Sequence, residues 1–420
     1  MKKILFMTVG TGVGNNIETT ESLAHGLLSS IVNVDPDFTV FFGSDGSKKT
    51  VDSIKAQYLG KYNKNFENYV FVHLNNINNF SDCFKTIEEK LSEYSPTDII
   101  KFNYTSGTKT MSVASAICAT LYKKELILVN GTRNDTNIVI GGTEENIQQN
   151  LFRVYDKLNL EKVKEFFNIN MFESAKIFLE KIKILDKKDI YSDLIDYYNH
   201  WDKFNHESAV KLYSQDFSNL SPNMNIQIQN NIKVLNIINS KANFKTDEKE
   251  NDLRCYYILA DLLNNADRRA GEGKYDDAIA RLYRSLELIA QIKLKKGYRL
   301  ITSNIDIEKV KKYCTDAHYI NRLNQQKNSH GKVQSGLKES FNLLNCLGDD
   351  LGKEFKKSEK KIGSMLSHRN MSILAHGLEH KNKKEYLEFK SVVLNLAKFL
   401  YQDIENFMEE AKFPKFGETN

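Results

Sequence analysis

The fold of this chain is constrained most by a regular alternation of short β-type runs and helical runs, which ends near residue 145. The β-type runs are rich in Val, Ile, Leu and Phe. The runs between them show the apolar spacing of amphipathic helices. Strands that alternate with crossover helices form a mostly parallel sheet with helices on both faces. The sequence therefore predicts an N-terminal α/β domain with a doubly wound sheet.

The predicted sheet is Rossmann-like, and its elements can be placed from the pattern. Strands are expected at residues 4–9, 38–43, 69–74, 98–104, 125–131 and 137–142, and the last two of these can pair as a hairpin. Helices are expected at residues 18–32, 48–59, 80–94 and 108–123.

After residue 150 the β-type runs stop, and the chain has the pattern of helices and loops to about residue 411. A strong amphipathic helix is expected from Tyr275, directly after the Gly271-Glu272-Gly273 turn, and a final helix from about 383 to 410. We therefore predict three parts. They are the α/β domain (1–147), a helical connector (148–250) and an all-α C-terminal domain (251–420).

Composition and charge are those of a globular protein in water, since 41% of the residues are hydrophobic and 27% are charged. No apolar run reaches the roughly 18 residues that a membrane helix needs.

The five cysteines are scattered and form no CxxC pair, which argues against a disulfide framework and a zinc site and favours a reducing, cytoplasmic location. Residues 1–150 carry 14 basic against 16 acidic side chains, so the net charge of +5 lies in the C-terminal part. A solvated surface explains this excess as well as transient contact with a polyanion does.

Two glycine-containing turns stand where a doubly wound sheet binds its ligand, at the carboxyl ends of strands. The first contains Gly10, Thr11 and Gly12, and the second contains Thr105, Ser106, Gly107, Thr108 and Lys109. If the strand order reverses between the first and fourth strands, the two turns lie side by side. Glycines, hydroxyl groups and a helix N-terminus suit a phosphate or ribose group. A nucleotide site is therefore predicted here, although tight turns with good helix caps are the alternative.

The two turns do not match the common nucleotide motifs. Asn15 stands where the dinucleotide-binding fingerprint requires a glycine, and Lys109 follows Thr108 where the Walker A motif has Gly before Lys. Ordinary NAD binding and ATP hydrolysis are therefore disfavoured.

Near the C-terminus, Arg369 and His376 are seven positions apart, which on one helix returns both side chains to the same face. RNA is cleaved without a metal when its own 2′-OH attacks the adjacent phosphate, a reaction that needs a proton shuttle and a cation. Imidazole and guanidinium supply these roles, and Asn370 adds a hydrogen bond or orients the pair. A solvated helix face is the alternative, and no metal-ligand set is recognised.

The Arg369-Asn370 and His376-Gly377 pairs resemble the R-x(4–6)-H motif of HEPN ribonucleases, and the two glycine turns resemble those of CARF domains. Their order in one chain is similar to the CARF-HEPN effectors of type III CRISPR systems, the Csm/Csx-like family. The segment 275–287 also looks like the helix that opens the HEPN portion in one branch of that family. Arg281 and Arg284 in this segment are candidate RNA or dimer contacts, with ordinary helix-surface charge as the alternative.

The resemblance implies a homodimer that binds a cyclic oligoadenylate, the tetra- or hexa-adenylate, as its allosteric activator and cuts single-stranded RNA in antiviral defence. It places Gly10, Thr11, Gly12, Thr105, Ser106, Gly107, Thr108 and Lys109 at the activator, and Arg369, Asn370 and His376 at the RNA. No cofactor or metal is required, and slow cleavage of the activator by the sensor domain is an additional expectation. The alternatives are a sensing adaptor that binds RNA or a protein without cutting, and a stand-alone toxin-like nuclease with another nucleotide ligand.

Overall fold

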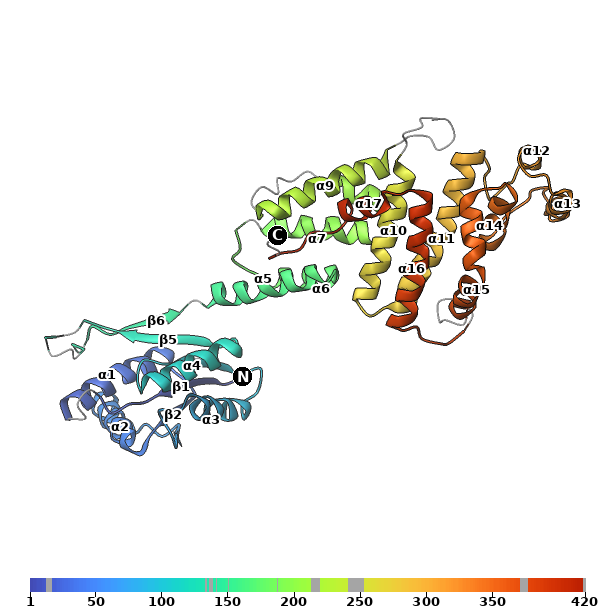
Figure 1. The fold of residues 1–420 in the computed structure, drawn as a ribbon. Helices are drawn as coiled ribbons and strands as arrows, with labels where there is room; N and C mark the ends of the chain where they lie inside the picture. The colour runs from blue at the N-terminus through green and yellow to red at the C-terminus, as the bar shows by residue number, and fades with distance from the viewer. Residues whose placement is uncertain are drawn as a thin grey trace. The chain divides into compact units, whose positions relative to one another are not determined.

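The computed structural model describes residues 1–12, 17–132, 134–135, 139–140, 142–149, 151–186, 188–212, 220–240, 253–370 and 377–417. For residues 152 and 367–370 it describes the backbone alone. Contacts divide the chain into two compact units, Met1–Lys157 and Leu158–Asn420, and each is described by itself. Figure 1 shows an α/β unit and a unit built from helices. None of the described helices is both long and apolar enough to cross a membrane.

The N-terminal unit contains one sheet in the order β3-β2-β1-β4-β5-β6. Its described strands are β1 (Lys3–Thr8), β2 (Phe38–Gly43), β3 (Tyr69–His73), β4 (Ile99–Asn103), β5 (Glu125–Asn130) and β6 (Glu145–Gln149). Neighbouring strands from β3 to β5 are parallel, and β6 is antiparallel to β5. The prediction of a mostly parallel, doubly wound sheet is confirmed, as is the reversal of strand order between β1 and β4.

Helices cover both faces of this sheet. They are α1 (Ile17–Val34), α2 (Lys48–Tyr62), α3 (Phe80–Ser92) and α4 (Lys109–Leu121), and a short 3-10 helix, η2 (Asp45–Ser47), precedes α2. Successive residues of a strand point to opposite faces. Accordingly Ile4 and Phe6 of β1 pack in the hydrophobic cluster of α3 and α4, while Leu5 and Met7 pack in the cluster of α1 and α2. The central strand is buried on both faces, which explains its continuous apolar sequence.

The sixth strand that we predicted at residues 137–142 falls partly outside the described residues, since 137, 138 and 141 are not described. The described strand β6 was not predicted; it begins at Glu145, after Ile140 and Gly142. The β6 residues Glu-Asn-Ile-Gln-Gln are mostly polar and lie half-exposed or exposed. An edge strand has a neighbour on one side alone, so its stability depends on backbone hydrogen bonds and requires little hydrophobic burial. The hydrophobic pattern therefore gave no signal for it.

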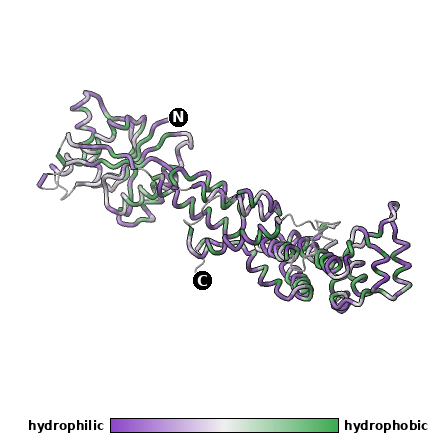
Figure 2. Tube along the Cα trace, turned by 90° about the horizontal axis from the view of Figure 1, so that it is seen from above, coloured by the Kyte–Doolittle hydropathy of each residue, from purple (hydrophilic) through white to green (hydrophobic). Residues whose placement is uncertain are grey.

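The C-terminal unit consists of helices and loops, as predicted; its described β-pairing is an isolated bridge between Ile301 and Asn304. From the unit boundary onward the described helices are α5 (Phe152–Asn168), α6 (Phe172–Glu180), α7 (Lys188–Asp202), α8 (His206–Lys211), α9 (Pro222–Asn239), α10 (Arg254–Gly271), α11 (Tyr275–Tyr298), α12 (Ile307–Lys311), α13 (Ala317–Gln325), α14 (Leu337–Cys346), α15 (Asp350–Asn370), α16 (Lys383–Leu400) and α17 (Ile404–Glu410). Helices α10, α11 and α16 run side by side (Figure 1). Hydrophilic and hydrophobic residues alternate along the helices (Figure 2).

The final helix that we predicted from about 383 to 410 is interrupted. It is divided into α16 and α17, because Tyr401 adopts an extended backbone (φ −151°, ψ 114°). The Tyr401 ring stacks on Tyr256 and on Phe407, with ring centroids 4.3 and 5.2 Å apart. This aromatic packing favours a turn at Tyr401, whose apolar ring otherwise fits the helical pattern.

One hydrophobic core runs through this unit, from Val163 to Phe413. The last described residues contribute to it, since the Phe413 ring packs against Trp201 at 5.1 Å. The side chain of Asn168 exchanges two hydrogen bonds with the backbone of Phe416, at 2.9 and 2.7 Å. Phe413 and Phe416 are thus held against helices of the predicted connector, and the separation of connector and C-terminal domain stays a prediction.

The cysteines depart from our expectation, because Cys314 and Cys346 form a disulfide. It joins the segment after α12 to the end of α14, with Cα atoms 5.5 Å apart. Cys83, Cys118 and Cys255 are buried and lie outside this disulfide. Two cysteines 32 residues apart give no local sequence signal for a disulfide, so this pairing results from the way the helices pack.

Candidate functional site

The two glycine turns of the N-terminal unit lie against each other. The Ser106 hydroxyl accepts a hydrogen bond from the backbone N–H of Gly10 at 2.9 Å, and the Ser106 carbonyl accepts one from the Thr8 hydroxyl. A Cβ atom at Gly10 would lie 3.0 Å from the backbone nitrogen of Gly107. Glycine is therefore required at position 10 by the close approach of the second turn.

The other predicted hydroxyl groups of the second turn also have protein partners. Thr105 Oγ1 accepts a hydrogen bond from the N–H of Val129 at 2.8 Å. Thr108 Oγ1 caps α4 and donates to the carbonyl of Ile77 at 2.7 Å. These hydroxyls fix the shape of the turn, and their contact with a ligand stays a prediction.

Two predicted residues remain open to a ligand at the start of α4. Gly107 is exposed and has a φ of +104°, a conformation that side chains other than glycine rarely adopt. Lys109 is exposed at the first position of the helix. The unpaired N–H groups of a helix N-terminus and a lysine both favour an anion. In the first turn, Gly12 has a φ of +82° and Thr11 is half-buried.

A third loop borders the same edge of the sheet, and sequence reasoning missed it. Residues 43–47 form this loop, which begins at Gly43, the last residue of β2, and β2 is the neighbour of β1. Thr50, in the helix that follows, donates to the Gly10 carbonyl at 2.7 Å. A Cβ atom at Gly46 would lie 3.4 Å from Thr11 Cγ2. The Gly-Ser-Asp-Gly-Ser sequence of the loop, at a strand end, was the signal available.

Charged groups extend this edge toward β3. Asp45 Oδ1 lies 2.8 Å from Lys48 Nζ and 3.4 Å from His73 Nδ1. The hydrogen bond from Lys48, together with His73, holds the pKa of Asp45 below its usual value. The carboxyl edge thus offers an anionic Asp45 and an imidazole beside the glycine turns.

The predicted nuclease residues lie at the limit of the described chain. Arg369 and Asn370 form the end of α15, where the backbone alone is described, and His376 lies outside the described residues. Their placement on one helix face therefore stays a prediction. His380, three residues after Gly377, is exposed.

Arg281 and Arg284 on α11 both contact neighbouring side chains. Arg281 Nη1 lies 3.0 Å from Asp277 Oδ1, and its Nε donates to the side chain of Asn265. Arg284 Nη1 donates to the side chain of Gln291 at 3.1 Å. The exposed Arg284 therefore fits the alternative of ordinary helix-surface charge, whereas Arg281 links α11 to the buried Asn265 of α10.

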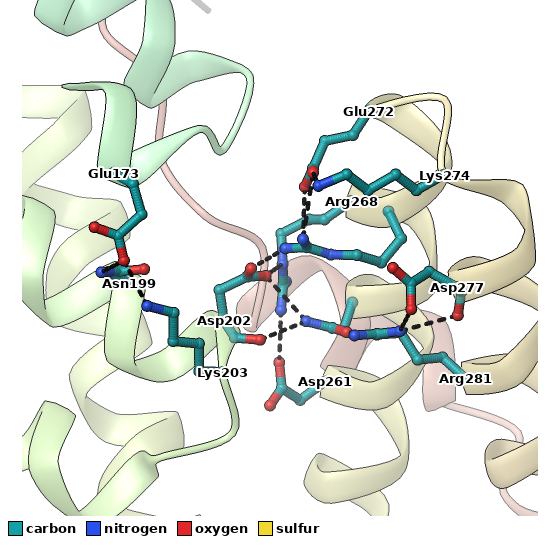
Figure 3. Close-up of polar contacts among 12 residues, drawn as sticks. Glu173, Asn199, Asp202, Lys203, Asp261, Arg268, Glu272, Lys274, Asp277 and Arg281 are labelled. Carbon is teal, nitrogen blue, oxygen red and sulfur yellow. Dashed lines mark hydrogen bonds and ion pairs between the residues drawn. The ribbon is translucent and has the colours of Figure 1, made fainter. Parts of the chain in front are cut away.

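A buried ion network joins α7 to α10, and the sequence gave no indication of it (Figure 3). Asp202 Oδ1 accepts a hydrogen bond from Arg268 Nε at 2.7 Å, and Asp202 Oδ2 pairs with Arg269. Arg268 also lies 3.4 Å from Asp261, which contacts His206 Nε2 at 2.9 Å. Burial lowers the pKa of Arg268, and the carboxylate of Asp261 opposes this shift. Because opposite charges are paired, the network is a structural link between these helices.

Comparison with known proteins agrees with this architecture. The family model of the Csm6 6H domain matches residues 155–245, and that of the Csm6 HEPN domain matches residues 248–400. A similar solved structure is Enterococcus italicus Csm6 bound to cyclic hexa-2'-fluoro-hexa-dAMP. It has a TM-score of 0.56 and 13% identity, and the match covers 98% of this chain and 100% of that one. At this identity the likeness concerns the fold. No curated protein sequence matches the chain.

A doubly wound α/β domain followed by a helical HEPN domain defines a CARF-HEPN protein, and this chain has both parts in that order. The two matching domain models are adjacent and together cover more than half of the chain. The chain belongs to the Csm6-like proteins, and the resemblance found in the sequence is confirmed.

Proposed function

We propose that this chain is a cytoplasmic endoribonuclease of CRISPR antiviral defence that a cyclic oligoadenylate activates and that cuts single-stranded RNA without a metal. The observation that carries the proposal is the contact between Ser106 and Gly10, which holds the two glycine turns together at the carboxyl edge of the sheet, in a chain that also has a Csm6 HEPN domain. We propose that these turns form the crevice that binds the activator. The Enterococcus italicus relative was solved with a cyclic hexanucleotide analogue, which supports this class of activator.

The proposed cleavage needs no group beyond the substrate and the protein. The 2′-OH of the RNA attacks the adjacent phosphate, and the 5′-oxygen of the next nucleotide leaves. His376 shuttles the proton, Arg369 binds the phosphate oxygens, and Asn370 orients the pair. The basic excess of residues 151–420 supports contact with RNA.

We propose that the active species is a homodimer. Val113, Ile117 and Leu121 are 49%, 39% and 61% exposed and recur every four residues along α4. Residues at this spacing form one apolar stripe. The stripe lies on the helix whose N-terminus borders the crevice. If a second copy packed against this stripe, the crevices of both copies could bind one ligand that has two-fold symmetry.

We also propose slow cleavage of the activator by the sensor domain. The hydroxyls of the second turn are held by backbone groups, so the favoured proton-transfer group is His73, which Asp45 orients. Incubation of the protein with cyclic hexa-adenylate should yield linear products over hours, and His73→Ala should stop this. Unchanged hydrolysis by that variant would contradict the role.

The nuclease proposal is tested with purified protein, a single-stranded RNA and EDTA, with and without cyclic tetra- or hexa-adenylate. We expect cleavage with one of the two activators. Arg369→Ala and His376→Ala should abolish cleavage and leave activator binding intact. Absence of cleavage with either activator favours the sensing adaptor, and calorimetry with mono-, di- and cyclic nucleotides would identify the other ligand of a stand-alone nuclease.

A further inference from the structure

The connection between α11 and α14, residues 299–336, carries a concentrated positive charge. We call it the basic arm, and it contains the short helices α12 and α13. It has seven basic and three acidic side chains, a net charge of +4. Residues 1–150 carry −2 and the whole chain +5, so residues 151–420 carry +7, and the arm holds more than half of it. The basic side chains are Arg299, Lys309, Lys311, Lys312, Arg322, Lys327 and Lys332.

The acidic side chains of the arm are engaged by the arm itself. Asp306 and Asp316 cap α12 and α13 by accepting hydrogen bonds from backbone N–H groups. Glu308 pairs with Lys311 at 2.7 Å. The arm therefore keeps its positive charge at the surface, where clustered charge of one sign attracts a polyanion.

Three lysines of the arm lack an ion pair. Lys312, Lys327 and Lys332 are exposed, and no residue in the described part of the chain forms an ion pair with them. Lys327 and Lys332 flank a tight turn, in which Asn328 Oδ1 accepts hydrogen bonds from the N–H groups of His330 and Lys332, both at 3.0 Å. The turn thus presents two unpaired ammonium groups, which are common contacts of phosphate oxygens.

Tyr313, the residue after Lys312, adds an aromatic surface to the arm. It is 53% exposed. Its ring packs against the ring of Tyr298 at 5.3 Å, with the two planes at 83°. Tyr298 is itself fixed, because its hydroxyl donates to Asp349 Oδ2 at 2.8 Å. An exposed ring that is held in place is a platform on which an unpaired base can stack.

The arm is fastened to α14 at two places. Cys314, which follows Tyr313, forms the disulfide with Cys346 at the end of α14. Glu339 on α14 accepts a hydrogen bond from the Tyr319 hydroxyl of α13 at 2.7 Å. A surface that is already ordered loses little conformational freedom when it binds a partner.

We propose that the basic arm is a binding surface for single-stranded RNA. Its unpaired lysines bind backbone phosphates, and the Tyr313 ring stacks on a base. The proposal deepens the proposed function, on which it rests for the identity of this RNA as the nuclease substrate. The bases of a duplex are already stacked and paired, so a single strand fits the arm better. Lysines and one aromatic ring read no base edge, and the arm should therefore bind RNA with little base preference.

The test measures binding of a labelled single-stranded RNA to the full-length protein without activator, at several salt concentrations. Replacing Lys312, Lys327 and Lys332 together by Ala should weaken binding about 10- to 100-fold. It should also reduce the slope of log affinity against log salt by about 2, because three phosphate contacts are lost. The matched control replaces three exposed lysines of the α/β unit, and it should bind like the wild type. These changes are Lys61→Ala, Lys64→Ala and Lys85→Ala.

Variants of Tyr313 separate stacking from charge. Tyr313→Ala should weaken binding about 10-fold and leave the salt slope unchanged, because it removes a ring and no charge. Tyr313→Phe keeps the ring and should bind like the wild type. Equal affinity of Tyr313→Ala and the wild type would show that no base stacks there, and the stacking part of the proposal would be wrong.

RNA cleavage by the activated protein separates the arm from the catalytic site. The triple-lysine variant should have a higher KM and an unchanged kcat, because the arm holds the substrate equally before and during the reaction. If that variant binds RNA with wild-type affinity and salt slope, or if the control loses as much, the proposal for the arm is wrong. If the wild type binds RNA through the arm and cuts none with either activator, the nuclease proposal fails and the arm stands.

Lysine acetylation tests the arm in the wild-type protein, without any substitution. Bound RNA should protect Lys312, Lys327 and Lys332 and leave Lys61 and Lys64 reactive. Polyglutamate at the same charge concentration should protect them less, because it offers no base to Tyr313. Equal protection by polyglutamate would show that the arm binds any polyanion, acidic proteins included, and would overturn the assignment to RNA.

Discussion

The Ser106 hydroxyl accepts a hydrogen bond from the Gly10 N–H at 2.9 Å and so ties the turn after β4 to the turn after β1. The two residues are 96 positions apart, and they meet because β1 and β4 are parallel neighbours in the sheet. Ser106 is buried, so its hydroxyl sets the distance between the turns.

Replacing Ser106 by Ala should weaken activator binding about fivefold, because the Gly10 N–H loses its partner and holding the two turns in the binding geometry then costs about 1 kcal/mol more. Calorimetry with cyclic hexa-adenylate measures the change. Ser92→Ala is the control, since the Ser92 hydroxyl bonds to the Glu89 carbonyl on α3. Equal affinity of the Ser106 variant and the wild type would show that the ligand does not use this crevice.

Replacing Lys109 by Ala should lower activator affinity and reduce its salt dependence, because one cation leaves the start of α4. Titrations at several salt concentrations should show a smaller slope than for the wild type. Lys85→Ala, an exposed lysine paired with Glu89 on α3, is the matched control. A fall in affinity that is the same for both variants would remove the specific role of Lys109.

The sequence predicted the central part of the sheet correctly, because buried parallel strands have continuous apolar runs such as Phe38–Gly43. It also predicted the meeting of the two glycine turns, which follows from strand order. It failed at β6, where an edge strand tolerates polar residues, and at Tyr401, where aromatic packing ends a helix whose pattern continues.

Long-range polar pairs could not be predicted. Asp202 and Arg268 are 66 residues apart, and Cys314 and Cys346 are 32 apart. Each residue alone has the ordinary sequence surroundings of a helix or a loop. The pairing depends on which helices become neighbours, and hydrophobic periodicity fixes the buried face of a helix but not its partner.

Replacing Asp202 by Asn should lower the free energy of unfolding by about 3 kcal/mol, because it removes the carboxylate shared by Arg268 and Arg269 in a buried site. Urea unfolding measures the loss. Lys203→Ala is the control, since Lys203 is 57% exposed and its pair with Glu173 is exposed as well (Figure 3). That change should cost less than about 1 kcal/mol. Similar losses for both variants would contradict the role of Asp202.

Thiol labelling at pH 8 should be slow in the folded protein. Burial raises the pKa of Cys118 from 9.0 to about 12 and also raises that of Cys83, so little thiolate forms. After unfolding, three cysteines should react without a reductant and five with one. Reaction of all five without reductant would rule out the disulfide.

The raised pKa of Cys118 also predicts a pH effect on stability. The unfolded thiol ionises near pH 9 and the folded one near 12. The contribution of Cys118 to stability is therefore complete below pH 9 and is lost as the pH rises toward 12. When urea unfolding is measured at increasing pH, Cys118→Ala should lose this part of the fall in the free energy of unfolding. An unchanged fall would show that other groups cause it.

Replacing Ile117 by Glu should weaken the proposed dimer, because it places a charge in the middle of the apolar stripe on α4. Sedimentation should show a shift toward monomer, and activator-dependent RNA cleavage should fall with it. Ile177→Glu is the matched control, since Ile177 on α6 is also exposed and apolar. If both variants keep the wild-type mass and cleavage, the copies associate through another surface. If the wild-type protein stays monomeric with the activator bound, the proposal that two copies share one activator is wrong, because the glycine turns of a single copy would then hold the ligand.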